Sequence, residues 1–333
     1  MVRLVIKIGL TFIAVIVLVF FGQVIFDTVY QFPKNLNYGV TFSPQYAKYL
    51  DLDWRQTFIK SLNELKVRNF RIPTYWSELE KEEGEFNFDD VDFMLDEIEK
   101  RQGKVILVVG FRQPRWPECY LPSWTRGLSL EEKRAKILNF IKATIERYEN
   151  RDSIWAYQVE NELFLPFFGE DCDKGDEESL KQEVDLVRGL SDKYIIISDS
   201  GELGNWIIPM QFSDVFGTTI YRDVYNSIMG YLTYPILPYL YNVKSQVIKN
   251  IFAPKNQRTI IVELQAEPWI GTSDLDKNPK KQEKHFPVSK LKGYINYAKK
   301  TGFDEVYLWG VEWWYFMAQN GHPEYLEYAK TLF

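Results

Sequence analysis

The chain has 333 residues, of which 46% are hydrophobic and 26% charged, so it is long enough for one large domain with a well-buried core. A net charge of −6 and the lack of any Lys/Arg block argue against nucleic acid as a partner, because phosphate binding needs a concentrated basic surface. Only two His and two Cys are present, too few for a His/Cys zinc site. We therefore expect no metal and no organic cofactor, and we assign any acid/base chemistry to carboxylates.

The N-terminal segment is predicted to anchor the chain in a membrane. From Ile8 to Phe26 the sequence is almost wholly apolar, which is the length needed to cross a hydrocarbon core of roughly 30 Å as a helix. Arg3 and Lys7 precede this segment. Positively charged flanks of a membrane helix tend to remain on the cytoplasmic side, so the rest of the chain is expected outside the cytoplasm. Residues 1–30 are thus predicted to be a single-pass signal anchor of the cell membrane. The alternative is a signal peptide whose cleavage leaves a secreted domain, although no small-x-small cleavage site is evident.

Strand-like and helix-like segments then alternate to the C-terminus without a composition break, so residues 31–333 are predicted to form a single domain. Eight short apolar runs are the predicted strands: Tyr38–Phe42, Asn69–Ile72, Lys104–Val109, Ile154–Val159, Tyr194–Ser198, Val215–Ile220, Thr259–Glu263 and Glu305–Trp309. The amphipathic helical patterns between and after them are Trp54–Val67, Val91–Arg101, Leu130–Tyr148, Glu178–Leu190, a weak one near Trp206–Phe212, Tyr241–Ile251, Val288–Lys300 and Tyr325–Phe333.

This alternation predicts an α/β fold of the (β/α)8, or TIM, barrel type. Runs such as KVILVVG and RTIIVEL are apolar without alternation, as expected of parallel strands that are covered on both faces. A doubly wound open sheet is the main alternative. Eight consecutive βα units without a Gly-rich phosphate loop favour closure into a barrel.

Polar and aromatic residues gather at the predicted strand ends, where the active site of such a barrel lies. They are Arg71, Asn161, Glu162, Tyr221, Glu263 and Trp309. Glu162 and Glu263 each stand at the mouth of a central strand and are expected to face each other across one pocket. Glycoside cleavage with retention needs such a pair, since one carboxylic acid protonates the leaving oxygen while a carboxylate about 5 Å away attacks the anomeric carbon. Arg71 and Tyr221 are expected to hydrogen-bond the nucleophile.

The motifs that carry these residues resemble a known group of enzymes. WAYQVENE ends the fourth strand in Asn161 and Glu162, and IIVELQAEPW ends the seventh in Glu263. In these features, from Tyr38 to the C-terminus, the chain resembles the clan of retaining (β/α)8 glycosidases that includes family 5 cellulases and mannanases, family 39 xylosidases and family 42 β-galactosidases. The segment PTYWSELEKEEGEFNFDDVD is similar to the region after strand two in families 42 and 39.

The resemblance implies roles for individual residues. Glu162 would be the acid/base, Glu263 the nucleophile, and Asn161 the partner of a sugar 2-hydroxyl. Arg71 in FRIP and Trp309 in YLWG match the strand-two arginine and strand-eight tryptophan of the clan. The chain departs from the family 5 pattern because no His lies two residues before its strand-six tyrosine, so the resemblance defines no single family and no substrate.

Several residues in the predicted loops have two alternative roles. Trp76, Trp116 and Trp313 are expected to stack on sugar rings, as are further tryptophans in these loops, although packing is the alternative for each of them. Glu267 is the competing nucleophile, but it follows the strand by several residues, which favours Glu263. Glu160 is expected to support the site from a deeper position, and Glu312 is expected to line the cleft. The apolar segment Ile228–Tyr241 is expected to pack over the barrel; the alternatives are that it narrows the cleft or that it rests on the bilayer.

We therefore predict a retaining O-glycoside hydrolase or transglycosylase that acts on a β-linked oligo- or polysaccharide. One alternative is a catalytically silent carbohydrate-binding barrel of the cell envelope, and a second is a structural envelope protein that uses the barrel as a scaffold. Cys119 and Cys172 fall in loops predicted on one face of the barrel, in a compartment where disulfides persist. A disulfide and two free thiols are both compatible with the sequence.

Overall fold

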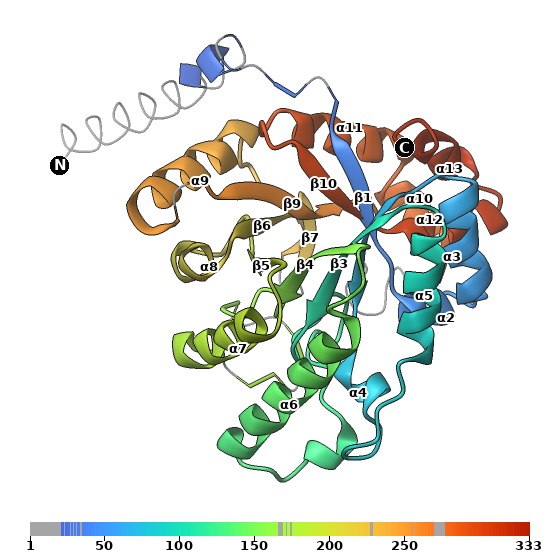
Figure 1. Cartoon of the computed structure of the whole chain (residues 1–333). Coiled ribbons are helices and arrows are strands. Elements are labelled where there is room, and N and C mark those ends of the chain that lie inside the picture. The colour runs from blue at the N-terminus through green and yellow to red at the C-terminus, as the bar shows by residue number, and fades with distance from the viewer. Residues whose placement is uncertain are drawn as a thin grey trace.

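The structure is a computed structural model, and it describes residues 21–333 except 23, 27, 29, 31, 34, 166–168, 171, 174, 227–228, 255 and 270–276. Eight parallel strands form a closed barrel in the order β1-β10-β9-β6-β5-β4-β3-β2 (Figure 1). Their bounds are Asn37–Thr41 (β1), Asn69–Pro73 (β2), Lys104–Val109 (β3), Ile154–Val159 (β4), Tyr194–Asp199 (β5), Val215–Ile220 (β6), Arg258–Gln265 (β9) and Glu305–Trp309 (β10). The predicted barrel is confirmed, and every predicted strand end lies within two residues of the observed one.

Helices surround the barrel and cover the outer face of its strands (Figure 1). The predicted ones are Trp54–Asn63 (α3), Asp89–Glu99 (α5), Leu130–Tyr148 (α6), Glu177–Leu190 (α7), Ile207–Phe212 (α8), Pro238–Phe252 (α9), Val288–Lys299 (α11) and Glu324–Ala329 (α13). The sequence did not predict Pro44–Tyr49 (α2), Trp76–Leu79 (α4), Pro279–His285 (α10), Val311–Gln319 (α12), the 3-10 turn Ser123–Thr125 or the hairpin of Asp223–Asn226 (β7) and Gly230–Thr233 (β8). The hairpin follows β6 and occupies part of the apolar segment 228–241.

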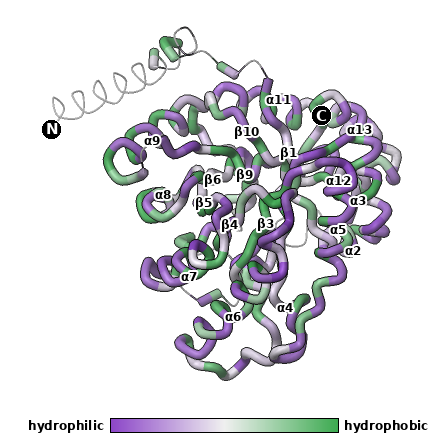
Figure 2. The backbone as a smooth tube through the Cα atoms, viewed as in Figure 1, coloured by the Kyte–Doolittle hydropathy of each residue, from purple (hydrophilic) through white to green (hydrophobic). Residues whose placement is uncertain are grey.

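Helix α6 illustrates how the sequence pattern produces this packing. Its first turn has a capping box, in which the Ser129 side chain accepts from the Glu132 backbone and the Glu132 carboxylate accepts from the Ser129 backbone. Ile137, Phe140 and Ile141 recur at helical spacing and are buried against the barrel. Hydrophobic and hydrophilic residues accordingly alternate along the outer helices (Figure 2).

Two loops at the mouth of the barrel are covalently joined. Cys119 follows β3 and Cys172 follows β4, and the two form a disulfide with their Cα atoms 5.4 Å apart. Of the two states compatible with the sequence, a disulfide and two free thiols, the structure has the disulfide. It ties the loop after β3 to the loop that carries Glu162.

The predicted membrane anchor at Ile8–Phe26 lies mostly outside the described residues. Within the part of the chain that the structure describes, no helix is both long enough and apolar enough to span a bilayer. The anchor therefore stays a prediction from the sequence.

Candidate active site

Arg71 on β2 is the centre of the buried polar network at the barrel mouth. Its Nη1 donates to Glu263 Oε1 at 2.5 Å, its Nη2 to Asn161 Oδ1 at 2.7 Å and its Nε to Gln158 Oε1 at 2.7 Å. Its side chain is fully buried, so these charge-assisted hydrogen bonds replace the water that a guanidinium otherwise needs. The structure thus brings together the residues predicted at the ends of strands two, four and seven.

Glu263, near the end of β9, has two strong donors. Besides Arg71, the Tyr221 hydroxyl donates to Glu263 Oε2 at 2.7 Å. Burial, followed by the charge of Glu263, raises the pKa of Tyr221 well above its usual range, so this hydroxyl keeps its proton and remains a donor. Both contacts are of the kind that stabilises negative charge on a carboxylate.

Glu162, just beyond β4, has the opposite surroundings. Its Oε1 accepts from the Thr219 hydroxyl at 2.9 Å, and it has no ion-pair partner among the described residues. Burial, followed by the charges of Glu263 and Glu118, raises the pKa of Glu162 well above its usual range. This carboxyl therefore keeps its proton to higher pH than an ordinary glutamic acid, as a proton donor requires.

Asn161 is held from both ends of its amide. Its Oδ1 accepts from Arg71 and from the Ser198 hydroxyl at 3.1 Å, whereas its Nδ2 donates to Glu118 Oε2 at 3.0 Å. Glu118 is only 4% exposed, and burial, followed by the charge of Glu263, raises its pKa to about 8. A third carboxyl thus faces the pair formed by Glu162 and Glu263.

Glu118 was not predicted from the sequence, because the residue lies in an irregular loop rather than at a strand end. It follows a cis peptide bond between Trp116 and Pro117 and has a positive φ of 70°. The available signal was an acidic residue beside a cysteine in the aromatic segment RWPECYLPSW.

Replacement of Glu118 by Gln is expected to move the alkaline limb of any pH–rate profile to lower pH, by about half a unit to one unit. The amide oxygen still accepts from Asn161, but the negative charge that opposes ionisation of Glu162 at high pH is gone. A kcat/KM profile between pH 5 and 9 measures the effect. Glu170→Gln, an exposed acid whose backbone N–H bonds the same loop at Pro117, is the matched control and should leave the limb in place. An unmoved limb in the Glu118 variant would contradict this electrostatic role.

Arg115 organises a second charged group beside the first. It forms ion pairs with Glu267 and, at 3.0 Å, with Glu312. Its guanidinium lies 3.7 Å from the ring centre of Tyr46 and 4.1 Å from that of Trp309. Glu267, the competing nucleophile, therefore belongs to the Arg115 network, whereas Glu263 belongs to the Arg71 network. Glu312 is fully buried rather than part of a cleft wall.

The aromatic residues predicted to bind sugar divide into two groups. Trp309 and Tyr221 lie edge to face with ring centres 6.3 Å apart, and Trp269 stands edge-on to Tyr221 at 5.2 Å, so both indoles lie beside the tyrosine that donates to Glu263. Trp116 is 59% exposed in the loop after β3. Of these four aromatic side chains, Trp116 is thus the most open to solvent, whereas Trp309 is buried.

The assignments of Trp76 and Trp313 to sugar binding are wrong. Trp76 is fully buried on α4, stacks on Phe140 and donates through Nε1 to Glu80 at 2.5 Å. Trp313 is fully buried on α12 and donates to Gln282 at 2.7 Å. The sequence predicts loops at both positions, but each tryptophan lies on a short helix whose apolar side faces the core, so neither indole has a free face for a sugar.

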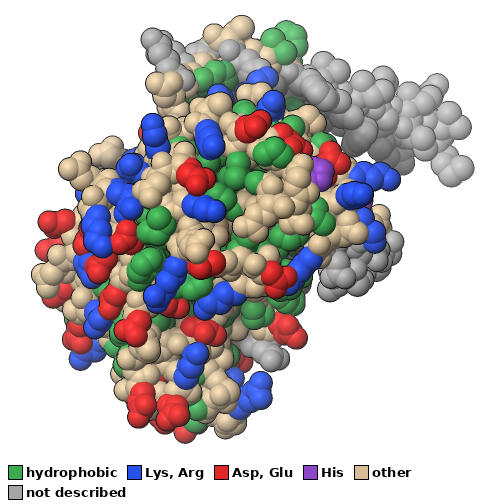
Figure 3. All heavy atoms as spheres, turned by 90° about the vertical axis from the view of Figure 1, so that its right-hand side faces the viewer, with side chains coloured by type: hydrophobic (Ala, Val, Ile, Leu, Met, Phe, Trp, Pro, Cys, Tyr) green, Lys and Arg blue, Asp and Glu red, His purple; other side chains and the backbone are tan. Residues whose placement is uncertain are grey.

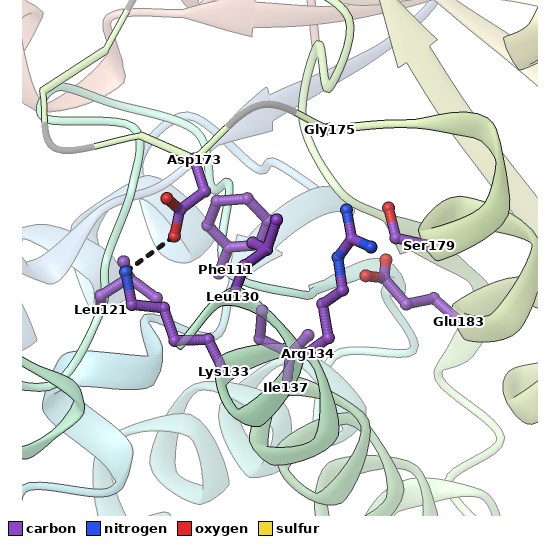
Figure 4. A pocket seen from close by; sticks show the side chains of 10 residues that line it. All are labelled: Phe111, Leu121, Leu130, Lys133, Arg134, Ile137, Asp173, Gly175, Ser179 and Glu183. Carbon is purple, nitrogen blue, oxygen red and sulfur yellow. Dashed lines mark hydrogen bonds and ion pairs between the residues drawn. The ribbon is translucent and has the colours of Figure 1, made fainter. Parts of the chain in front are cut away.

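Glu160 links the start of the Glu162 loop to the loop after β3. Its carboxylate accepts from the backbone N–H groups of Phe111 at 2.9 Å and Arg112 at 2.6 Å, and it lies close enough to the buried carboxyl of Glu183 on α7 for the two to interact electrostatically. Glu183 lines a small cavity between α6 and α7, toward which Arg134 is directed (Figure 4). Two buried carboxyls in contact require a shared proton.

Protonation of this carboxyl pair should couple folding to pH. Burial raises the pKa of Glu160 to about 7, and burial followed by the charge of Glu160 raises that of Glu183. Because the folded-state pKa values are raised, the pair contributes most to stability below about pH 4.5, and this contribution is lost as the pH rises through 7.

Glu183→Gln is expected to reduce the fall in unfolding free energy between pH 5 and pH 8 by roughly 1–3 kcal/mol, since its amide donates to Glu160 without a titrating proton. Urea unfolding at both pH values measures the difference, with the exposed Glu178→Gln of the same helix as the control. Equal pH dependence in the Glu183 variant and in the unaltered protein would refute the shared proton.

Among the described residues, no group of three or more His, Cys, Asp or Glu side chains is arranged to hold a metal ion. The absence of a metal or organic cofactor stays a prediction from the sequence.

Comparison with known proteins gives similarity at the level of structure only. No protein-family model and no curated protein sequence matches the chain. A GH5_18 protein from Streptomyces cattleya, solved in complex with GlcNAc, superimposes with a TM-score of 0.58 at 12% identity, over 83% of this chain and 70% of that protein. The chain has the fold of (β/α)8-barrel glycoside hydrolases.

Two further structures support the same conclusion about the fold. GH5_18 from Bifidobacterium longum subsp. longum gives a TM-score of 0.56 at 14% identity, over 83% of this chain and 70% of that one. A beta-galactosidase from the psychrophilic Marinomonas ef1 gives 0.54 at 13% identity, over 82% of this chain but only 54% of the other, so the chain spans little more than half of that enzyme.

Proposed function

We propose that the protein is a retaining O-glycosidase or transglycosylase that cleaves a β-linked glycan by double displacement. The observation that carries the proposal is the contrast between two buried carboxyls at one barrel mouth. Glu263 accepts from a guanidinium and a phenol, whereas burial and the charge of Glu263 keep the proton on Glu162. This division between an anion and an acid is what retaining cleavage requires.

The residues would act in two steps. In the first, Glu263 attacks the anomeric carbon and forms a glycosyl ester, while Glu162 gives its proton to the departing glycosidic oxygen. In the second, Glu162 takes a proton from water or from a sugar hydroxyl, which attacks the anomeric carbon and releases Glu263. Tyr221 and Arg71 would hold the Glu263 carboxylate in place through both steps.

Two observations support a saccharide substrate: the aromatic side chains at the site and the ligand of a structural neighbour. The aromatic rings of Trp269 and Trp309 beside Tyr221 suit a pyranose, because sugar C–H faces pack on such rings while hydroxyl groups meet buried polar side chains. A GH5_18 neighbour from Bifidobacterium longum subsp. longum was solved in complex with Manb1-4GlcNAc, a β-linked disaccharide. We propose a β-linked oligo- or polysaccharide for this chain as well.

We further propose that residues 8–26 anchor the enzyme in the membrane with the barrel on the extracytoplasmic side. The apolar sequence and the preceding Arg3 and Lys7 support this orientation. The Cys119–Cys172 disulfide agrees with it, since such bonds persist in oxidising compartments.

Covalent labelling tests the enzymatic proposal. The full chain would be incubated with a panel of 2-fluoro glycosides of differing sugar configuration, followed by intact-mass analysis and peptide mapping. We expect a mass increment on Glu263 that Glu263→Gln cannot acquire. Labelling of Glu267 would keep the mechanism and move the nucleophile. Sugars that bind by calorimetry without any labelling or turnover would support the silent binding barrel instead.

A further inference from the structure

Exposed apolar side chains are concentrated in two short segments of the described chain. Seven of its fourteen exposed large hydrophobic residues lie there: Phe21, Val24 and Ile25 near the N-terminus, and Val243, Val247, Ile251 and Phe252 on α9. On α9, three of them recur every four residues and therefore form one stripe along the helix. Ile251 is 66% exposed and Val247 is 52% exposed, so this stripe is not part of the core.

The two segments are in contact. The ring of Phe26 lies 5.8 Å from that of Tyr239 in the first turn of α9, and Gly22 is so close that a Cβ there would come within 2.8 Å of the Tyr239 hydroxyl. The Tyr30 hydroxyl donates to the Gly302 carbonyl at 3.1 Å, which fixes the end of this segment on the barrel. Both apolar groups therefore lie on the same side of the domain (Figure 1).

Acidic residues are missing from the sequence around α9. Residues 224–262 contain Lys244, Lys249, Lys255 and Arg258 but neither Asp nor Glu, although 46 acidic residues in 333 would place about five in such a stretch. The first 26 residues also carry only positive charges. By contrast, the face shown in Figure 3 carries Lys and Arg interspersed with Asp and Glu. In the structure Lys244 donates to the Gly201 and Gly204 carbonyls and Arg258 pairs with Asp304 and Glu305, so among the described residues Lys249 is the cation of this stretch left to face a partner. An apolar stripe on a helix that carries Lys but no acid is typical of a helix that lies on an anionic lipid surface.

We propose that α9 rests on the membrane surface, with Val243, Val247 and Ile251 inserted at the boundary between headgroups and acyl chains. The proposal rests on the membrane anchor proposed above and extends it, because contact through α9 would fix the orientation of the barrel mouth relative to the bilayer. A second copy of the chain is a poorer occupant, since a symmetric contact would bring the like charges of two α9 helices together. Lys249, next to the stripe on α9, instead complements anionic headgroups.

Site-specific labelling in lipid nanodiscs tests the proposal on the full chain. Because Cys119 and Cys172 are bonded, Val247→Cys supplies a single free thiol for an environment-sensitive fluorophore. Lys142→Cys on α6, an exposed site on a different side of the barrel, is the control. We expect doxyl-labelled lipids to quench the probe at 247 and aqueous iodide to quench the probe at 142. Lys249→Glu should weaken the lipid quenching at 247, and anionic lipid should strengthen it.

The other outcomes of the quenching experiment would show what surrounds the α9 stripe instead of lipid. Iodide quenching at 247 equal to that at 142 would leave the stripe in water and overturn the proposal. Protection from both quenchers would mean that protein covers the stripe, either the N-terminal segment or a second copy, and would also overturn it. A chain that elutes apart from the nanodiscs would overturn both the anchor and the α9 contact. Labelling of Glu263 by 2-fluoro glycosides is independent of these results, so the glycosidase proposal stands or falls separately.

Discussion

Replacement of Glu263 by Gln is expected to lower kcat/KM by roughly 10⁴-fold or more, because the first step then lacks its nucleophile. The amide keeps the shape of the side chain and can still accept from Tyr221, so we expect the fold to survive. The measurement is steady-state hydrolysis of the aryl glycoside that labels the unaltered enzyme, with circular dichroism as the check on folding.

Two controls sharpen this prediction. Glu263→Ala with added azide should yield a glycosyl azide of inverted configuration, because azide replaces the missing carboxylate on the same face of the sugar. Glu267→Gln should retain turnover, since Glu267 is bound to Arg115 rather than to Arg71. A dead Glu267 variant together with an active Glu263 variant would reverse the assignment.

The barrel was predictable because its signal is regular. Buried parallel strands are apolar on both faces, as in KVILVV, where the last five residues are fully buried. Each is followed by an amphipathic helix, and closure places strand ends at one mouth. From these ends alone, the sequence located Arg71, Asn161 and Glu263, which the structure joins through hydrogen bonds.

The parts that the sequence did not predict depend on contacts distant in the chain. Trp76 and Trp313 were expected in loops because α4 and α12 are short and follow strand ends, where no helical period is visible. Their burial is decided by partners far along the sequence, such as Phe140 for Trp76 and Gln282 for Trp313. Glu118 was missed for the same reason, since only the folded loop brings it to Asn161.

Glu162→Gln is expected to separate substrates by their leaving groups. Loss of a general acid typically costs 10²- to 10⁴-fold, so cleavage of a natural glycan or an alkyl glycoside should fall by about that factor. The phenolate of an aryl glycoside with an acidic phenol departs without needing a proton. For such a substrate, formation of the glycosyl-enzyme should therefore be nearly unaffected. Added azide should then accelerate its turnover and give a glycosyl azide of retained configuration, since azide needs no base to attack the ester on Glu263.

The pH profile supplies a second, independent reading of Glu162. Because burial and the charge of Glu263 raise the Glu162 pKa, the acid form persists to higher pH than in an ordinary glutamic acid, and activity should fall as the pH rises through that raised pKa. In Glu162→Gln the alkaline limb should vanish for the aryl substrate. Persistence of the limb in this variant would assign it to another group, with Glu118 at a pKa of about 8 as the nearest candidate. The Glu118→Gln and Glu162→Gln profiles together therefore determine which of the two carboxyls carries the proton that reaches the leaving oxygen.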